Sequence, residues 1–155
     1  AICFEDAIQG LFTHHLETES GDFVVRRRDR LIAYQLAVVV DDEVQGVTEI
    51  LRGADLIDST PRQIWLQSRL NFRTPSYAHI PVMTHSNGDK LSKLTGAPAI
   101  SLNRVETVLV EALEALGQSP PEGFGGDSLT NIWSWAVENW QIRNLNGLKQ
   151  VVKTS

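Results

Sequence analysis

The sequence has little cysteine and no long uncharged apolar run, and each shortage excludes a class of protein. Cys3 is the single cysteine among 155 residues, so the chain has neither an internal disulfide nor a zinc site built from cysteines. This favours a reducing compartment, and we expect the cytoplasm. No segment approaches the roughly 18 apolar residues of a membrane-spanning helix, and no basic region precedes an apolar one near residue 1. We therefore expect no membrane partner.

Positively charged residues are also fewer than negatively charged ones. Lys and Arg number 14 against 19 Asp and Glu, which gives a net charge of -5. This is the wrong sign for a protein that holds nucleic acid by a general electrostatic field. One dense basic group remains, Arg26-Arg27-Arg28 followed by Arg30. It could contact phosphates, or it could be a solvated strand end balanced by acidic neighbours.

The apolar pattern of the first 42 residues predicts α/β structure. Residues 1–22 carry apolar side chains spaced like one helix face, or like a strand followed by a helical turn. Residues 33–40 are nearly all apolar, which predicts a central parallel strand buried on both faces. Asp41 and Asp42 would then lie at the carboxyl end of this strand, where open α/β sheets bind ligands, as candidates for a metal or acid-base role. The alternative is that one caps a turn and the other is solvated.

A strand and a helix are predicted next. Residues 47–51 read as a strand that runs into Arg52, which places this arginine in a loop at the ligand edge of the sheet. Thr60, followed by proline and with Gln63 three positions on, predicts a helix that starts with a capping box. Residues 77–83 read as a further strand that is irregular at its proline.

Two helices are predicted in the last third of the chain, over residues 105–116 and 129–140. Asn103 and Asp127 or Ser128 are the candidate caps of their first turns, and Gly117 ends the first helix. A linker rich in proline and glycine separates them.

The second of these helices carries three tryptophans. Trp133 and Trp140 share its apolar stripe with aliphatic residues, so we expect them in the core rather than as a platform for stacked bases. Trp135 lies off that stripe and is expected to be freer.

A polar loop follows the predicted strand at residues 77–83. It contains Lys90-Leu91-Ser92-Lys93, which puts two ammonium groups around one hydroxyl in a flexible, glycine-flanked segment. Such a loop suits phosphate, although solvated lysine pairs are common.

Several blocks in this order resemble one family, the class I glutamyl-type aminoacyl-tRNA synthetases. They are residues 23–29, 33–42, 45–48, 51–56, 59–63 and 90–93. The chain looks most like the short members of the family, which join glutamate to the queuosine at the wobble position of tRNA(Asp). The resemblance implies an α/β fold: the second half of a Rossmann-like class I catalytic domain over residues 1–100, followed by a small helical tRNA-stem-contact region over 101–155.

The resemblance also implies a set of site residues. Tyr34 and Arg52 match the positions that bind glutamate. Lys90-Leu91-Ser92-Lys93-Leu94 matches the KMSKS-type loop, in which Lys93 is the ATP contact and opposes the charge that develops on pyrophosphate. Charge and position alone suggest tRNA contact by Arg26, Arg27 and Arg28. The implied partners are L-glutamate, ATP with Mg²⁺ and tRNA(Asp), and the intact protein is expected to be a monomer.

The chain also departs from the family pattern. The family commonly has glycine at the position of Arg30, and glutamine and asparagine at the positions of Leu94 and Thr95. The histidine-rich first signature and the cysteine-containing zinc element lie upstream in these enzymes and have no counterpart here. We therefore expect this chain to be the C-terminal half of a synthetase, inactive alone, with zinc only in the other half and no metal site of its own.

Three other interpretations stay open at this point. A truncated discriminating glutamyl-tRNA synthetase would need a large helical extension beyond residue 155, and the resemblance implies that it activates glutamate only when tRNA is present. A non-catalytic tRNA-binding or glutamate-binding module would explain the missing first signature but would have no use for Lys93. A metal-dependent hydrolase would be built on Asp41 and Asp42.

Overall fold

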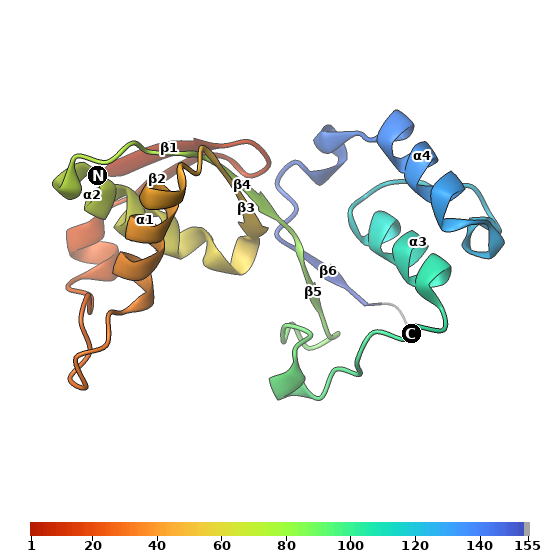
Figure 1. The fold of residues 1–155 in the computed structure, drawn as a ribbon, viewed down its shortest axis with the longest axis horizontal. Helices are drawn as coiled ribbons and strands as arrows, with labels where there is room; N and C mark the ends of the chain where they lie inside the picture. Colours follow the sequence, from red (N-terminus) through yellow and green to blue (C-terminus); the bar gives the residue numbers. More distant parts are fainter. Residues whose placement is uncertain (154–155) are drawn as a thin grey trace. The chain divides into compact units, whose positions relative to one another are not determined.

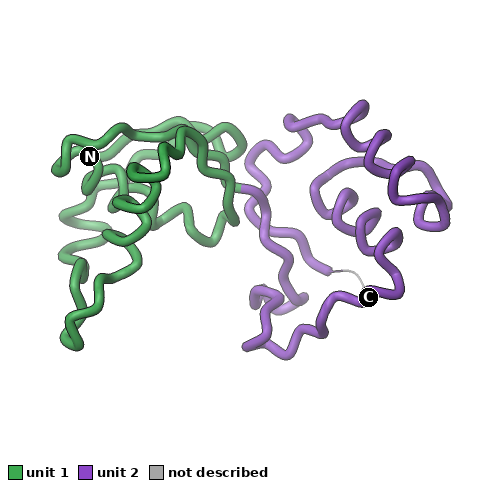
Figure 2. The backbone as a smooth tube through the Cα atoms, in the orientation of Figure 1, with its two compact units in different colours: residues 1–79 green, residues 80–155 purple. Residues whose placement is uncertain are grey.

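The computed structural model describes residues 1–153. The chain folds as two compact units, residues 1–79 and 80–155, which are coloured separately in Figure 2. The first unit holds, in chain order, β1 (Ile2–Asp6), β2 (Gly10–His14), a helical turn (Leu16–Ser20), α1 (Tyr34–Gln45), β3 (Glu49–Gly53), a 3₁₀ turn (Ala54–Ser59), α2 (Thr60–Leu70) and β4 (Ser76–Ile80). The second holds β5 (Val82–Thr84), a 3₁₀ turn (Lys93–Thr95), α3 (Val105–Ala115), a 3₁₀ turn (Phe124–Gly126), α4 (Leu129–Asn139), a 3₁₀ turn (Ile142–Leu145) and β6 (Gln150–Val152). Figure 1 labels the helices and strands.

A mixed sheet organises the first unit, with strand order β2-β1-β4-β3. The β1 and β2 strands form an antiparallel hairpin, and β1 pairs in parallel with β4, where Asp6 lies opposite Tyr77. Aromatic rings pack across these strands, with Phe4 centred 5.3 Å from Phe12 and 5.8 Å from Tyr77. The strands β3 and β4 flank α2 along the chain, as predicted. At the start of the chain, residues 1–22 form the β1–β2 hairpin and a turn, and no amphipathic α-helix.

The predicted central strand at residues 33–40 is wrong, because this segment opens α1. The helix begins at Tyr34 and ends at Gln45. Its C-cap, Gly46, takes a left-handed conformation, and the Gly46 N–H donates to two carbonyls of the last turn. Valines favour strands locally, but a twelve-residue segment with a glycine C-cap can bury one helical face instead. Val39 is the residue of that face that is fully buried.

The location of Asp41 and Asp42 changes with this correction. Both lie within α1, not at the carboxyl end of a strand. Asp41 is exposed, and residues 1–153 contain no group of three His, Cys, Asp or Glu side chains that could hold a metal ion. The geometry that motivated an acid-base or metal role for this pair is therefore absent from the described chain.

The helix α2 begins where the sequence predicts, but its capping differs. Ser59 occupies the N-cap without a side-chain capping bond, Thr60 is the first helical residue, and Pro61 lies in the first turn. Gln63 completes no capping box. It is buried, and its Nε2 donates to Oε1 of Gln35 on α1 at 2.9 Å. The Thr60 hydroxyl is thus available for other contacts.

In the second unit, α3 and α4 share a small core of Leu113, Ile132 and Ala136. The predicted helices are confirmed, with Ser128 Oγ capping α4 and Gly117, at φ 69°, following α3. The predicted cap of α3, Asn103, is wrong, because the N-cap residue is Arg104 and its side chain makes no capping bond. No helix within residues 1–153 is long and apolar enough to cross a membrane.

The three tryptophans in and directly after α4 are arranged differently from the prediction. Trp133 and Trp140 are 56% and 40% exposed, whereas Trp135 packs against the core with its ring 5.8 Å from that of Phe124. Apolar residues occupy more than one face of this helix, so the periodicity alone could not show which face would meet α3.

Candidate functional site

Arg52 lies on β3 itself and not, as predicted, in the loop that follows the strand. It is held by groups from three other elements of the first unit, which are β4, α2 and the 54–59 turn. Its Nε donates to Nε2 of His79 on β4 at 3.0 Å. Its Nη2 donates to Oγ1 of Thr60 on α2 at 2.7 Å and to the Leu56 carbonyl at 3.5 Å. The guanidinium carbon lies 5.5 Å from the centre of the Tyr77 ring. Among the hydrogen bonds within residues 1–153, none uses Nη1 of this arginine.

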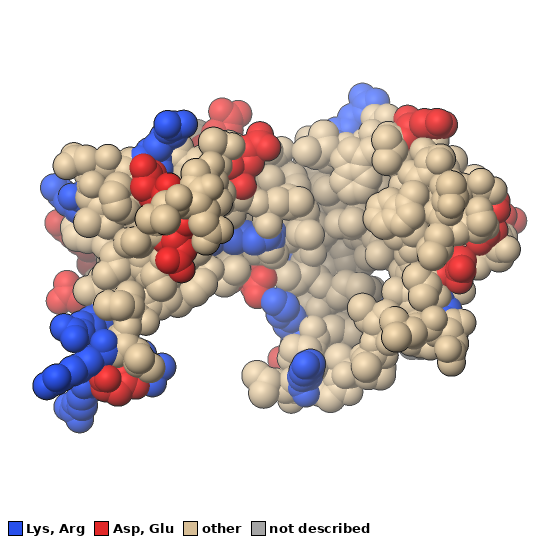
Figure 3. Space-filling model, viewed as in Figure 1, with Lys and Arg blue, Asp and Glu red and all other residues tan. Residues whose placement is uncertain are grey.

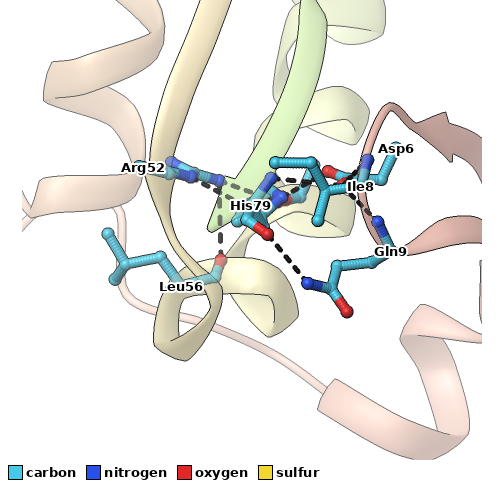
Figure 4. Close-up of polar contacts among 7 residues, drawn as sticks. Asp6, Ile8, Gln9, Arg52, Leu56 and His79 are labelled. Carbon is cyan, nitrogen blue, oxygen red and sulfur yellow. Dashed lines mark hydrogen bonds and ion pairs between the residues drawn. The ribbon is translucent and has the colours of Figure 1, made fainter. Parts of the chain in front are cut away.

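His79 connects Arg52 to Asp6 (Figure 4). Its Nδ1 lies 2.6 Å from Oδ2 of Asp6, and both side chains are fully buried. An arginine only donates, so Nε2 of His79 must accept and Nδ1 must carry the proton that it donates to the carboxylate. The contacts themselves thus assign the tautomer of His79.

Asp6 is held in turn by backbone amides at the end of β1. Its Oδ1 accepts the N–H groups of Ile8 at 3.1 Å, Gln9 at 2.8 Å and His79 at 3.1 Å. The Gln9 side chain also donates to the His79 carbonyl at 2.8 Å. These bonds tie the turn after β1 to β4 and leave the carboxylate facing the imidazole.

Burial and charge set the ionisation of this pair. Burial lowers the pKa of His79, and the charge of Arg52 lowers it further. Asp6 raises this pKa, but the net result is a pKa below the usual value. Burial raises the pKa of Asp6, but the hydrogen bonds from Gln9, His79 and Ile8 outweigh this and leave its pKa below the usual value. At neutral pH a neutral imidazole therefore lies between a guanidinium and a carboxylate.

Tyr34 and Asp42 of α1 lie near the same cluster. Tyr77 is buried, and burial raises its pKa. Gln67 and Arg52 act to lower this pKa, whereas the charges of Asp42 and Tyr34 act to raise it further. Burial likewise raises the pKa of Asp42 against the opposing charge of Arg52. Tyr34 is 50% exposed. The two predicted glutamate-binding residues thus both lie within electrostatic reach of Tyr77.

The loop at residues 90–94 belongs to the second unit and continues from β5. Lys90 forms a bridge with Thr84, and the Leu91 N–H donates to the Met83 carbonyl at 2.8 Å. The bridge is antiparallel, so the chain reverses in the turn at residues 85–89 and these contacts hold residues 90 and 91 beside β5.

Ser92 then caps the 3₁₀ turn at Lys93–Thr95. The Thr95 N–H donates to Oγ of Ser92 at 3.3 Å, and the Ser92 N–H donates to Oγ1 of Thr95 at 2.9 Å. Lys93 is exposed, and Leu94 is 98% exposed. The cap orders the backbone and leaves the Lys93 ammonium in solvent, where a phosphate could meet it.

The arginines at 26–28 lie in an exposed loop between the Leu16–Ser20 turn and α1. Within this loop, one isolated bridge forms, between Arg26 and Ile32. Arg27 forms an ion pair of 2.8 Å with Asp29, and Arg30 takes a positive φ of 69° in the turn. Figure 3 shows basic side chains gathered at the tip of this loop.

Sequence reasoning missed Asp6, His79 and the role of Thr60. The available signal was chemical: a histidine within a strand that alternates toward a core must find a partner when it is buried. The sequence could not identify the partners of His79, because 73 positions separate it from Asp6 and 27 separate it from Arg52.

Residues 1–117 match the family model described as "tRNA synthetases class I (E and Q), catalytic domain". Curated relatives named glutamyl-Q tRNA(Asp) synthetase include one from Dechloromonas aromatica (strain RCB), 52% identical over 137 residues that cover 88% of this chain and 46% of the relative. Another, from Verminephrobacter eiseniae (strain EF01-2), is 53% identical over 144 residues that cover 93% and 48%. The chain spans about half the length of the curated relatives it matches.

Solved structures show the same fold. A glutamate-tRNA synthetase from Elizabethkingia anophelis matches with a TM-score of 0.71 at 19% identity, covering 99% of this chain and 34% of that chain. A glutamate tRNA ligase from Elizabethkingia meningosepticum, solved in complex with its amino acid, matches with a TM-score of 0.67. The predicted α/β fold of a class I catalytic domain is thereby confirmed.

Proposed function

Because the chain belongs to the family of class I tRNA synthetases for glutamate and glutamine, a family of ATP-using ligases, we propose that it forms part of an enzyme that activates glutamate and transfers it to the queuosine at the wobble position of tRNA(Asp). One observation carries the proposal: about half of the aligned residues are identical to those of relatives named glutamyl-Q tRNA(Asp) synthetase.

Arg52 supports glutamate as the amino acid. A guanidinium pairs well with a carboxylate, and the pair strengthens where water is partly excluded. Arg52 is half-buried and already oriented through Nε and Nη2, so Nη1 is available for the glutamate side chain. The hydroxyl of Tyr34, half exposed at the start of α1, would contact the same substrate.

In the proposed reaction, an oxygen of the glutamate α-carboxylate attacks the α-phosphorus of ATP, and pyrophosphate leaves. Lys93, on the loop 90–94, would stabilise the negative charge that develops on the pyrophosphate. A tRNA hydroxyl then attacks the glutamyl carbonyl, the anhydride bond to phosphate breaks, and AMP leaves. Magnesium would arrive with the ATP phosphates, because residues 1–153 offer no group of three acidic, His or Cys side chains that could bind it.

Further assignments belong to the same proposal. Arg26, Arg27 and Arg28 contact the tRNA backbone, and residues 101–155 form the helical region that meets the tRNA stem. The catalytic part of the chain ends near residue 100. The intact enzyme is a cytoplasmic monomer.

The test is glutamate-dependent ATP–pyrophosphate exchange by the full-length protein that carries this sequence, with and without tRNA. We expect exchange in the absence of tRNA, and an Arg52→Ala variant with kcat/KM for glutamate lowered by about 30-fold or more. Arg69→Ala is the matched control, since this arginine also lies over an aromatic ring, 5.3 Å from Trp65, but is exposed on α2. Exchange that requires tRNA would indicate a glutamyl-tRNA synthetase, and no exchange would indicate a binding module.

A further inference from the structure

We propose that His79 and Asp6 are positioning residues for glutamate recognition, which hold the Arg52 guanidinium in the orientation that receives the substrate's side-chain carboxylate. The inference rests on the proposed function, in which Arg52 binds glutamate. It adds two buried residues, from β1 and β4, that would not touch the substrate themselves.

The geometry of Arg52 carries the argument. A guanidinium is planar, so bonds at two of its nitrogens fix the plane and the direction of the third. His79 Nε2 engages Nε at 3.0 Å, and Thr60 Oγ1 engages Nη2 at 2.7 Å. The edge that carries Nη1 is left for a ligand. An arginine held in this way loses less side-chain entropy when it binds a carboxylate than a mobile one would.

The imidazole must be neutral for this arrangement. If His79 gained a second proton, its Nε2–H would face the Nε–H of Arg52, and a hydrogen bond would become a repulsion between two cations. Asp6 prevents the alternative neutral tautomer, because its carboxylate at 2.6 Å accepts the Nδ1 proton. The three backbone N–H groups on Oδ1 hold this carboxylate in place.

The groups that face His79 come from several elements. They are Asp6 on β1, Arg52 on β3, Asp55 in the 54–59 turn, Thr60 on α2 and Tyr77 on its own strand. The carboxylates favour a protonated imidazole, while burial and Arg52 oppose it, and the net effect is a pKa below the usual value. Protonation of His79, which would release Arg52, should therefore require a pH lower than the one that protonates an ordinary histidine.

Two substitutions separate positioning from simple packing. The amide oxygen of a glutamine can reach the place of the imidazole Nε2, so His79→Gln can keep the bond to Arg52. The side-chain amide of an asparagine is shorter and reaches only the place of the imidazole Nδ1. His79→Asn can therefore keep the bond to Asp6, but it loses the bond to Arg52. A purely structural role would make the two variants alike.

The experiment measures exchange kinetics of the full-length protein and both variants. We expect His79→Asn to raise KM for glutamate by about 10- to 100-fold, the effect of losing a hydrogen bond to a charged group, with KM for ATP changed less than about threefold. His79→Gln should stay within about threefold of the wild type for both substrates. The wild-type KM for glutamate should rise once the pH falls below the lowered pKa of His79, and that of His79→Gln should not.

His14→Asn is the matched control, because His14 is also buried but bonds Oγ of Ser20 at 2.7 Å and makes no bond to Arg52. If Arg52→Ala impairs glutamate use and His79→Asn behaves like His14→Asn, the inference is overturned while the proposed function stands. If the wild type shows no exchange, or Arg52→Ala leaves KM for glutamate unchanged, the proposed function fails and the inference fails with it.

Discussion

Arg30 adopts a backbone conformation that suits glycine better than arginine. Its φ of 69° lies in the left-handed region, where a Cβ is crowded by the neighbouring carbonyl, and its side chain is exposed. Arg30→Gly should therefore raise the free energy of unfolding by about 0.5–1 kcal/mol, the relief of strain less the added entropy of the unfolded chain. Urea denaturation of the wild type and the variant measures this difference.

The neighbouring Arg28 provides the comparison for that prediction. It is equally exposed and is not among the residues with positive φ. Arg28→Gly should lower the free energy of unfolding, by up to about 1 kcal/mol, because only the entropic cost remains. Equal effects of the two substitutions would show that the Arg30 conformation stores no strain.

The cluster around Arg52 shows how far a residue's chemistry depends on its partners. Thr60 reads in the sequence as a helix cap, and in the structure its hydroxyl accepts from Arg52 and lies 3.2 Å from Nε2 of His79. The charge of an arginine is a property of the residue alone. Its direction depends on groups brought in from other elements.

At the scale of the element, α1 offers a direct test of the helix that replaces the predicted strand. Val39 is 2% exposed and Val44 is 80% exposed. Val39→Ala should lower the free energy of unfolding by about 1–2.5 kcal/mol through lost burial and a cavity. Val44→Ala should change it by no more than about 0.5 kcal/mol, since alanine favours a helix and no contact is lost.

Thermal or urea unfolding of both variants decides between the two structures. A strand buried on both faces at residues 33–40 would make Val38→Ala and Val40→Ala as damaging as Val39→Ala. In α1 these two valines are half-buried, so smaller losses are expected. Equal losses at all three positions would contradict the helix.

At the scale of the molecule, charge is distributed unevenly over a chain of net charge -5. The exposed loop with Arg26, Arg27 and Arg28 concentrates positive charge against this background. If the loop contacts tRNA phosphates, the double variant Arg27→Glu/Arg28→Glu should weaken tRNA binding. It should also lower the slope of log affinity against log salt by about 1 for each lost phosphate contact. Binding is measured with the full-length protein over a range of salt concentrations.

A control for net charge is available in the same unit. Arg69→Glu/Arg73→Glu changes the charge by the same amount at two exposed arginines near the end of α2. If both double variants weaken binding equally at every salt concentration, the effect comes from net charge and the loop makes no specific contact. A larger effect at Arg27 and Arg28 supports contact through the loop.

Local patterns were sufficient for several elements. The strand β3 and the helices α2, α3 and α4 are signalled by apolar spacing and turn residues that act within a few positions, although the predicted caps of α2 and α3 are wrong. Order and spacing of the blocks were sufficient for the family. Such features can be predicted from the sequence, because turn chemistry and periodicity need no distant partner.

The contacts between elements required the folded chain. Residues 34–45 carry enough apolar side chains for a strand or a helix, and packing against the rest of the first unit selects the helix that buries Val39. The link from Asp6 through His79 to Arg52 joins three strands that are distant in the sequence. A hydrogen bond between buried groups depends on distance and direction in space, and the residue types alone specify neither.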